Sequence, residues 1–178
     1  RGVEGAPEGD RNMGGTPMPH CGAGRAFAGD VADVVAVNPG ALAGIGEQLT
    51  ISMRFRFEEE PGLQTLVSGL REEGPEEWLN FGLKSPDTLH TNATSNGQRA
   101  PELNVAGLRP GQWHGVTARY DARNHTRTLC LDGVTLAMDS ALPGPLRLTE
   151  MRLGRGVLHF EPWQLNGQIL EFRLSNVA

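Results

Sequence analysis

The sequence predicts an all-β domain in which two antiparallel sheets pack face to face as a β-sandwich. Short runs of alternating apolar and polar residues recur along the chain, and a two-residue period is typical of strands with one buried face. The chain holds 24 glycines and 12 prolines, which favours many short strands joined by turns. These runs number about a dozen, too many for one open sheet without curling, so two packed sheets are expected.

The length and composition indicate one folded domain behind a polar segment. A chain of 178 residues fits a single domain with a substantial core. Residues 1–20 are rich in Gly, Pro, Glu, Asp and Asn without periodicity, which predicts a flexible N-terminal tail or linker, and 21–178 form the predicted domain. The first residues lack the apolar stretch of a signal peptide, so we expect an excised module rather than an intact precursor.

The first half of the chain carries one unambiguous strand and several shorter candidates. In residues 49–57 every odd position is apolar and every even position is polar, a pattern that a helix would scatter around its circumference. Short strands are expected over 24–30 and 33–37, the second ended by Asn38-Pro-Gly40. Residues 64–68 are expected to return as a strand, and the acidic run 71–77 is expected to be a solvated loop.

A β-meander in the second half is expected to be the centre of the fold. In Gly111–Tyr120, Val116, Ala118 and Tyr120 alternate with polar or small residues, and a second run over 127–131 ends at Asp132-Gly133, a dipeptide suited to a tight hairpin turn. The remaining strand candidates are 79–83, an edge strand within 88–100, 146–148, 150–154 and 167–174.

The order of these motifs resembles the laminin G-like, concanavalin A-like jelly-roll modules, especially those of large secreted or surface bacterial proteins. Four pieces carry the resemblance over 21–178: Ala26-Phe-Ala-Gly-Asp30 with Asp33-Val-Val, Leu49-Thr-Ile-Ser-Met-Arg-Phe55, the meander with Leu129-Cys-Leu-Asp-Gly133, and Leu153-Gly154 followed by 165–174. The resemblance implies a jelly-roll topology. It also implies a module that binds glycans or proteins, holds calcium, or braces a neighbouring catalytic domain, so each site needs its own argument.

The resemblance implies a possible calcium site formed by Asp30, Asp33 and Glu171. Such relatives often hold an ion between the opening turn and the last strand through oxygen ligands. This chain has Ala28 and Leu170 where the family commonly has aspartates, and both changes remove an oxygen ligand. Ordinary turn-capping aspartates explain the remaining carboxylates equally well.

The sequence predicts that the module is not an enzyme. Jelly-roll glycoside hydrolases and lyases work from the concave face, and the usual hydrolysis needs two facing carboxylates, at i and i+2 or i+4 when one strand supplies both. No predicted strand here carries such a pair, and no nucleophile motif or phosphate-binding loop is present. A hydrolase or lyase is therefore the third-ranked hypothesis, behind carbohydrate binding and behind a structural or protein-adhesion module without a small ligand.

Carbohydrate binding requires an aromatic platform beside directional polar groups. Trp113 matches a structural position of the family and is expected in the core, whereas Trp78 and Trp163 lie in or beside loops and are the candidates for exposure, with packing as the alternative. The polar residues expected to join them, if the loops converge, are Arg155, His159, Glu161, Asn80 and Gln164.

Charge and cysteine usage limit the partners. The net charge of −5 and the lack of a basic patch argue against nucleic acid as a partner. The sequence has no apolar run of about 20 residues, so it predicts no membrane span. Cys21 and Cys130 could form a disulfide or remain free thiols. The expected setting, from the resemblance and a strong bias toward arginine over lysine, is the outside or surface of a bacterial cell, with a glycan or a neighbouring domain of a larger protein as the partner.

Overall fold

The computed structural model describes residues 25–28, 35–43, 45–59, 62–71, 74–156 and 163–176. Within these ranges the chain forms thirteen strands and one short helix. Their bounds are β1 (Arg25–Ala28), β2 (Val35–Ala36), α1 (Pro39–Leu42), β3 (Gln48–Phe57), β4 (Gln64–Arg71), β5 (Gly74–Ser85), β6 (Thr88–Ser95), β7 (Gln98–Arg99), β8 (Leu103–Ala106), β9 (His114–Asp121), β10 (Thr126–Leu131), β11 (Val134–Asp139), β12 (Glu150–Leu153) and β13 (Asn166–Ser175).

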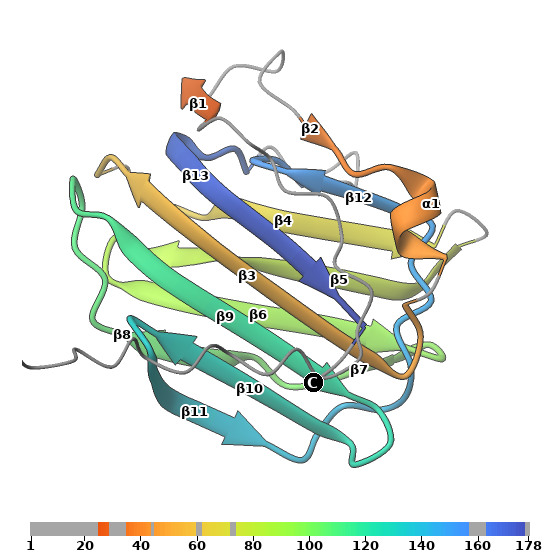
Figure 1. The fold of residues 1–178 in the computed structure, drawn as a ribbon. Helices are drawn as coiled ribbons and strands as arrows, with labels where there is room; N and C mark the ends of the chain where they lie inside the picture. The colour runs from red at the N-terminus through yellow and green to blue at the C-terminus, as the bar shows by residue number, and fades with distance from the viewer. Residues whose placement is uncertain are drawn as a thin grey trace, which may run out of the picture.

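The strands form two antiparallel sheets that lie one behind the other (Figure 1). The first, called sheet A, has six strands in the order β1-β13-β3-β9-β10-β11. The second, called sheet B, has the order β2-β12-β4-β5-β6-β7, with β8 also paired to β6. The prediction of an all-β, two-sheet antiparallel sandwich is confirmed.

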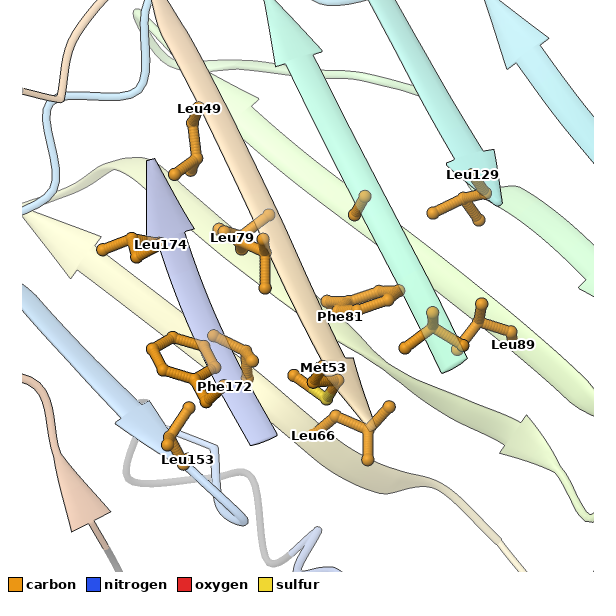
Figure 2. Close-up of a cluster of buried hydrophobic side chains, with 14 of the residues drawn as sticks. Leu49, Met53, Leu66, Leu79, Phe81, Leu89, Leu129, Leu153, Phe172 and Leu174 are labelled. Atoms are coloured by element: carbon orange, nitrogen blue, oxygen red, sulfur yellow. The ribbon is translucent and has the colours of Figure 1, made fainter. Parts of the chain in front are cut away.

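The hydrophobic core lies between the two sheets and is formed by the apolar set of each alternating strand. In β3, Leu49, Ile51, Met53, Phe55 and Phe57 are all buried, as the two-residue period predicted. Figure 2 shows leucines and phenylalanines of both sheets meeting in this layer. Full burial of one such side chain stabilises the fold by about 1.5–3 kcal/mol, so the sandwich rests mainly on this layer.

Two polar contacts lie inside the apolar layer. The Tyr120 hydroxyl of sheet A lies 2.6 Å from the Thr91 hydroxyl of sheet B, and the Thr91 hydroxyl lies 3.1 Å from the Asn80 carbonyl, to which it donates. Because the single Thr91 proton is engaged there, Tyr120 is the donor between the sheets, and burial raises the pKa of its phenol. The fully buried guanidinium of Arg127 binds both carboxylate oxygens of Asp139 and donates to the Pro101 carbonyl.

The predicted hairpin turn at Asp132-Gly133 is confirmed. Both residues have positive φ values, 49° and 82°, and they join β10 directly to β11. The Asp132 carboxylate accepts hydrogen bonds from the Gly115 N–H at 2.7 Å and from the His114 ring at 3.0 Å. Partial burial acts to raise the pKa of Asp132, but these two donors outweigh it and lower the pKa. The hairpin is thereby joined to the start of β9.

Two local predictions are wrong, because strand pairing or core packing overrides a local signal. The acidic run 71–77 is not a loop throughout, since β4 reaches Arg71 and β5 starts at Gly74, where the two strands pair. Residues 146–148 form no strand, although Leu146 and Leu148 are buried at the core. The prediction that Asn38-Pro-Gly40 ends the second strand is confirmed, and the Asn38 side chain also caps α1 by accepting a hydrogen bond from the Gly40 N–H at 2.8 Å.

Several other expectations fall on residues outside the described ranges. The tail 1–20 and Cys21 are among them. Cys130 is a half-buried free thiol on the outer side of β10, 3.3 Å from the Thr135 hydroxyl. Among the described residues, no helix has the length and hydropathy needed to span a bilayer.

Candidate functional site

Three polar side chains lie side by side on the outer face of sheet B, away from the core. In β5 and β6 the residues Leu79, Phe81, Leu89 and Ala93 point into the core, so the residues between them point outward. These are Asn80, His90 and Asn92, with Asn80 directly opposite Asn92 in the ladder. Although they face outward, they are only 1%, 3% and 4% exposed. We call these three residues the polar floor.

The polar floor retains hydrogen-bonding atoms that no protein group satisfies. Asn80 donates to the Thr65 hydroxyl at 3.2 Å and Asn92 donates to Glu102 at 3.4 Å, but the side-chain carbonyl oxygen of each asparagine has no partner. Nδ1 of His90 and the indole N–H of Trp78 are unpartnered as well. A buried polar atom left unpaired costs about 1–3 kcal/mol, so a group of four such atoms on one face requires an explanation.

A glycine keeps the β5 side of His90 open. Gly82 lies opposite His90 in the ladder, and a Cβ atom at this position would come within 2.3 Å of the Gln64 carbonyl oxygen. Any other residue would push β4 away from β5. As a result no β5 side chain lies opposite the imidazole in the ladder, although the His90 residue is only 3% exposed.

The floor is electrically neutral and is flanked by ion pairs. Burial lowers the pKa of His90 to about 4, against a smaller opposing effect of Glu102, so the imidazole is uncharged at neutral pH. Lys84 pairs with Glu102 beyond β6, and a hydrogen bond from this lysine lowers the pKa of Glu102. On the opposite side Arg152 pairs with Glu150 on β12. These ion-pair side chains are partly exposed, so solvent reaches the rim of the face more easily than its floor.

The structure places the predicted glycan-binding residues as follows. Trp78 lies on the outer face of sheet B, beside the polar floor, but it is only 9% exposed. Arg155 and Gln164 form an isolated bridge, and half-buried Trp163 accepts a hydrogen bond from the Gly156 N–H at 3.3 Å. This segment joins β4 through the Gly154 N–H and the Leu66 carbonyl.

The two remaining members of that set, His159 and Glu161, lie outside the described residues. The structure therefore brings Trp78 and Asn80 together on one face, and it brings Arg155, Gln164 and Trp163 together beside the start of β4.

The expectation that Trp113 belongs to the core is wrong. Trp113 is 37% exposed, and the guanidinium carbons of Arg54 and Arg56 lie 5.9 and 5.8 Å from its ring centroid. It precedes β9 and lies over the outer face of sheet A, where the two arginines contact it. Its neighbour His114 is buried, and Nδ1 of His114 lies 3.0 Å from the Asp132 carboxylate.

The residues predicted to hold calcium are only partly described. Asp30 and Asp33 lie outside the described residues. Glu171 is exposed on the outer face of sheet A and is paired in register with Arg54. A cation is disfavoured beside a guanidinium, so Glu171 fits a calcium ligand poorly. In the parts of the chain that are described, no three potential ligands cluster. Calcium binding by Asp30, Asp33 and Glu171 stays a prediction.

Sequence reasoning did not single out His90 and Asn92. The signal that could have found them is the alternation in Thr88–Ser95, where Leu89, Thr91 and Ala93 share one face and His90 and Asn92 share the other. That pattern places them outward, but their shielding from solvent depends on the neighbouring strands.

Solved structures with similar folds come from several kinds of protein. A K499G mutant of the NanB sialidase from Streptococcus pneumoniae matches 91% of this chain and 26% of its own, with 16% identity and a TM-score of 0.75. The Ruminococcus gnavus IT-sialidase CBM40 bound to alpha2,3 sialyllactose matches 90% of this chain and 88% of its own, with 16% identity and a TM-score of 0.64. Domains LG4-5 of the mouse laminin alpha1 chain match 93% and 45%, with 14% identity and a TM-score of 0.69.

These likenesses concern the fold, and the chain spans about a quarter of the NanB chain that it matches. No curated protein matches the chain. The family described as the concanavalin A-like lectin/glucanases superfamily matches residues 21–178, the part of the chain in which the sequence motifs lie. The chain is a member of that superfamily.

Proposed function

We propose that this chain is a non-catalytic carbohydrate-binding module of an extracellular protein, with its glycan on the outer face of sheet B over the polar floor. The observation that carries the proposal is the set of unpartnered hydrogen-bonding atoms on Asn80, His90, Asn92 and Trp78. Sugar hydroxyls both donate and accept hydrogen bonds, so one saccharide could satisfy the two amide oxygens, the imidazole nitrogen and the indole N–H together.

The chemistry of the floor favours an uncharged, hydroxyl-rich portion of the glycan as its ligand. Two amides and an uncharged imidazole offer directional hydrogen bonds without a net charge, whereas the charged groups on either side already pair with each other. Trp78 adds an apolar ring beside these groups, and a sugar presents C–H faces suited to an indole. The floor thus joins polar and aromatic groups on one sheet face.

Among the described residues, the two carboxylates that flank the floor support a binding role over hydrolysis. Glu150 lies on β12 and Glu102 lies just before β8, four strand spacings apart across sheet B. At the usual spacing of neighbouring strands this separation is about 19 Å, well beyond the separation of about 5–10 Å that glycoside hydrolysis uses. Both carboxylates are also held in ion pairs.

The structural neighbours are compatible with this role and with an extracellular setting. One is a sialidase CBM40 whose structure contains alpha2,3 sialyllactose, and another is a pair of laminin domains. At 14–16% identity these proteins supply no residue of the site, so the glycan must be found by experiment.

The test is an array of neutral and acidic oligosaccharides that includes alpha2,3 sialyllactose, followed by calorimetry with the strongest binder. Asn92→Ala removes one group of the floor, and Trp78→Phe removes the indole N–H beside the floor while it keeps an aromatic ring. Loss of one hydrogen bond to a buried partner weakens binding by about 1–3 kcal/mol, which is roughly 5- to 150-fold. Gln112→Ala, at an exposed amide ahead of β9, is the control.

Binding to no glycan, or equal binding by the floor variants and the control, would overturn the proposal. Trp163→Ala tests the second predicted aromatic residue in the same assay, because the backbone of Trp163 belongs to the segment that joins the start of β4. Unchanged binding in that variant would remove Trp163 from the site while leaving the floor in place.

A second candidate function, protein adhesion or bracing against a neighbouring domain, is favoured by the edge strand β11. Val134, Leu136 and Met138 are 57%, 50% and 70% exposed along this strand, which ends sheet A. Exposed apolar residues on an edge strand offer a surface for another chain or domain. Met138→Lys should abolish such an association in sedimentation experiments with the full-length protein, and unchanged association would count against this role.

A further inference from the structure

A hollow of about 300 Å³ lies on the outer face of sheet A, on the opposite side of the sandwich from the polar floor. Strands β13, β3, β9 and β10 cross beneath it, with the hairpin glycine Gly133 at one end. Its polar lining includes Ser52, Thr117, Arg54, Arg173 and Glu171. The volume is at the lower end of the range for small-ligand pockets, about 300–1,000 Å³, and suits one sugar ring.

The hollow exists because a glycine occupies an outward position of β9. Gly115 lies opposite Arg54 in the ladder, and a Cβ atom there would meet only the Asp132 carboxylate, at 3.8 Å. A side chain at this position would therefore fit without strain and would project into the space between Arg54 and the hairpin. The floor beside it is formed by the Ser52 and Thr117 hydroxyls, which lie 3.0 Å apart.

The hollow carries an excess of positive charge in a chain of net charge −5. Arg54 and Arg173 line it against one carboxylate, Glu171, which is paired in register with Arg54. Arg54 is also held against the exposed Trp113 ring, and this contact restrains its guanidinium before any ligand arrives. A guanidinium presents parallel N–H donors that match a carboxylate in a two-point contact.

We propose that this hollow is a second saccharide site, specific for a sugar acid whose carboxylate binds Arg54 and Arg173 and whose hydroxyls bind Ser52 and Thr117. The site is separate from the polar floor, which carries no free charge, so one domain would hold an acidic sugar on one face and a neutral sugar part on the other. An acidic peptide is less suited, since both sides of β3 and β9 are already paired in the sheet and leave no edge for a peptide strand.

The experiment measures binding of trigalacturonate to the whole chain by calorimetry, with its methyl ester as the uncharged control. Arg173→Gln and Arg54→Gln should each weaken binding about tenfold or more, as expected for losing a charge-assisted hydrogen bond. Gly115→Val removes no charge and should weaken binding to the same degree by filling the hollow. Arg119→Gln is the matched control, because Arg119 is exposed on the same face but does not line the hollow.

Each outcome bears on the proposal. The proposal is supported if the acid binds more tightly than its ester, if the three hollow variants lose trigalacturonate binding, and if Arg119→Gln retains it. Equal weakening by Arg119→Gln and Arg173→Gln would show diffuse attraction and overturn the site, as would absence of binding at millimolar trigalacturonate. Stronger binding of a poly-glutamate peptide than of trigalacturonate would overturn the sugar assignment. Asn92→Ala should leave trigalacturonate binding unchanged, so failure of the floor site and failure of this site are distinguishable.

Discussion

Acidification should destabilise the protein through His90. Burial lowers the pKa of this imidazole from 6.5 to about 4, so the folded protein holds the ring neutral where the unfolded chain already binds a proton. Since the unfolded state binds more protons, the free energy of unfolding is unaffected above pH 6.5 and falls as the pH decreases below it. The loss is complete below about pH 4, where both states are protonated.

The magnitude follows from the pKa difference. A shift of about 2.5 pH units at 1.36 kcal/mol per unit amounts to about 3 kcal/mol of stability lost between pH 6.5 and 4. This is a large fraction of the 5–15 kcal/mol that is typical of a folded domain. The charges that face the ring modify the effect in opposite directions, because Glu102 raises the pKa of His90 while Lys84 and Arg99 lower it.

The assay is urea unfolding of the wild type and His90→Gln between pH 7 and 3.5. Glutamine cannot titrate, so the stability of the variant relative to the wild type should improve by about 3 kcal/mol over this range. As the pH falls, protonation of carboxylates with lowered pKa values, such as Asp87, destabilises both proteins. This effect cancels in the stability difference between them. A stability difference that is independent of pH would refute the reasoning. If the variant does not fold, the same pKa is read directly from an NMR titration of the wild-type ring, and a value near 6.5 would refute it equally.

Three further predictions concern the core and calcium. Asp139→Ala leaves the buried Arg127 guanidinium without its carboxylate and should lower the free energy of unfolding by about 3 kcal/mol, measured by urea unfolding; a loss below about 1 kcal/mol would contradict the role of this pair. Tyr120→Phe removes the donor between the sheets and should cost about 1 kcal/mol in the same assay, and an unchanged midpoint would argue against that hydrogen bond. Calcium bound through Asp30, Asp33 and Glu171 should raise the melting temperature relative to a sample with chelator, whereas equal melting temperatures would remove the calcium prediction.

Local sequence patterns were sufficient to predict the clearest strand and the hairpin turn. The alternation in residues 49–57 and the Asp132-Gly133 turn depend on neighbours within a few positions, and the structure confirms both. The run 71–77 misled because its charges are typical of a loop, whereas pairing of Arg71 with Gly74 extends both strands. Backbone hydrogen bonds to another strand can outweigh the preference of an acidic run, and those bonds are not visible in the run itself.

The sequence by itself determined the sandwich architecture, because a two-residue period states which side chains share a face. Only the tertiary structure decided how far each outward face meets solvent, since that depends on strands distant in the sequence. Trp113, expected in the core, lies against Arg54 and Arg56 on the surface, while Trp78, a candidate for exposure, is shielded on sheet B. The hollow joins residues from strands far apart in the chain whose register no local pattern specifies, whereas the polar floor lies on the consecutive strands β5 and β6 and only its shielding depends on the rest of the fold.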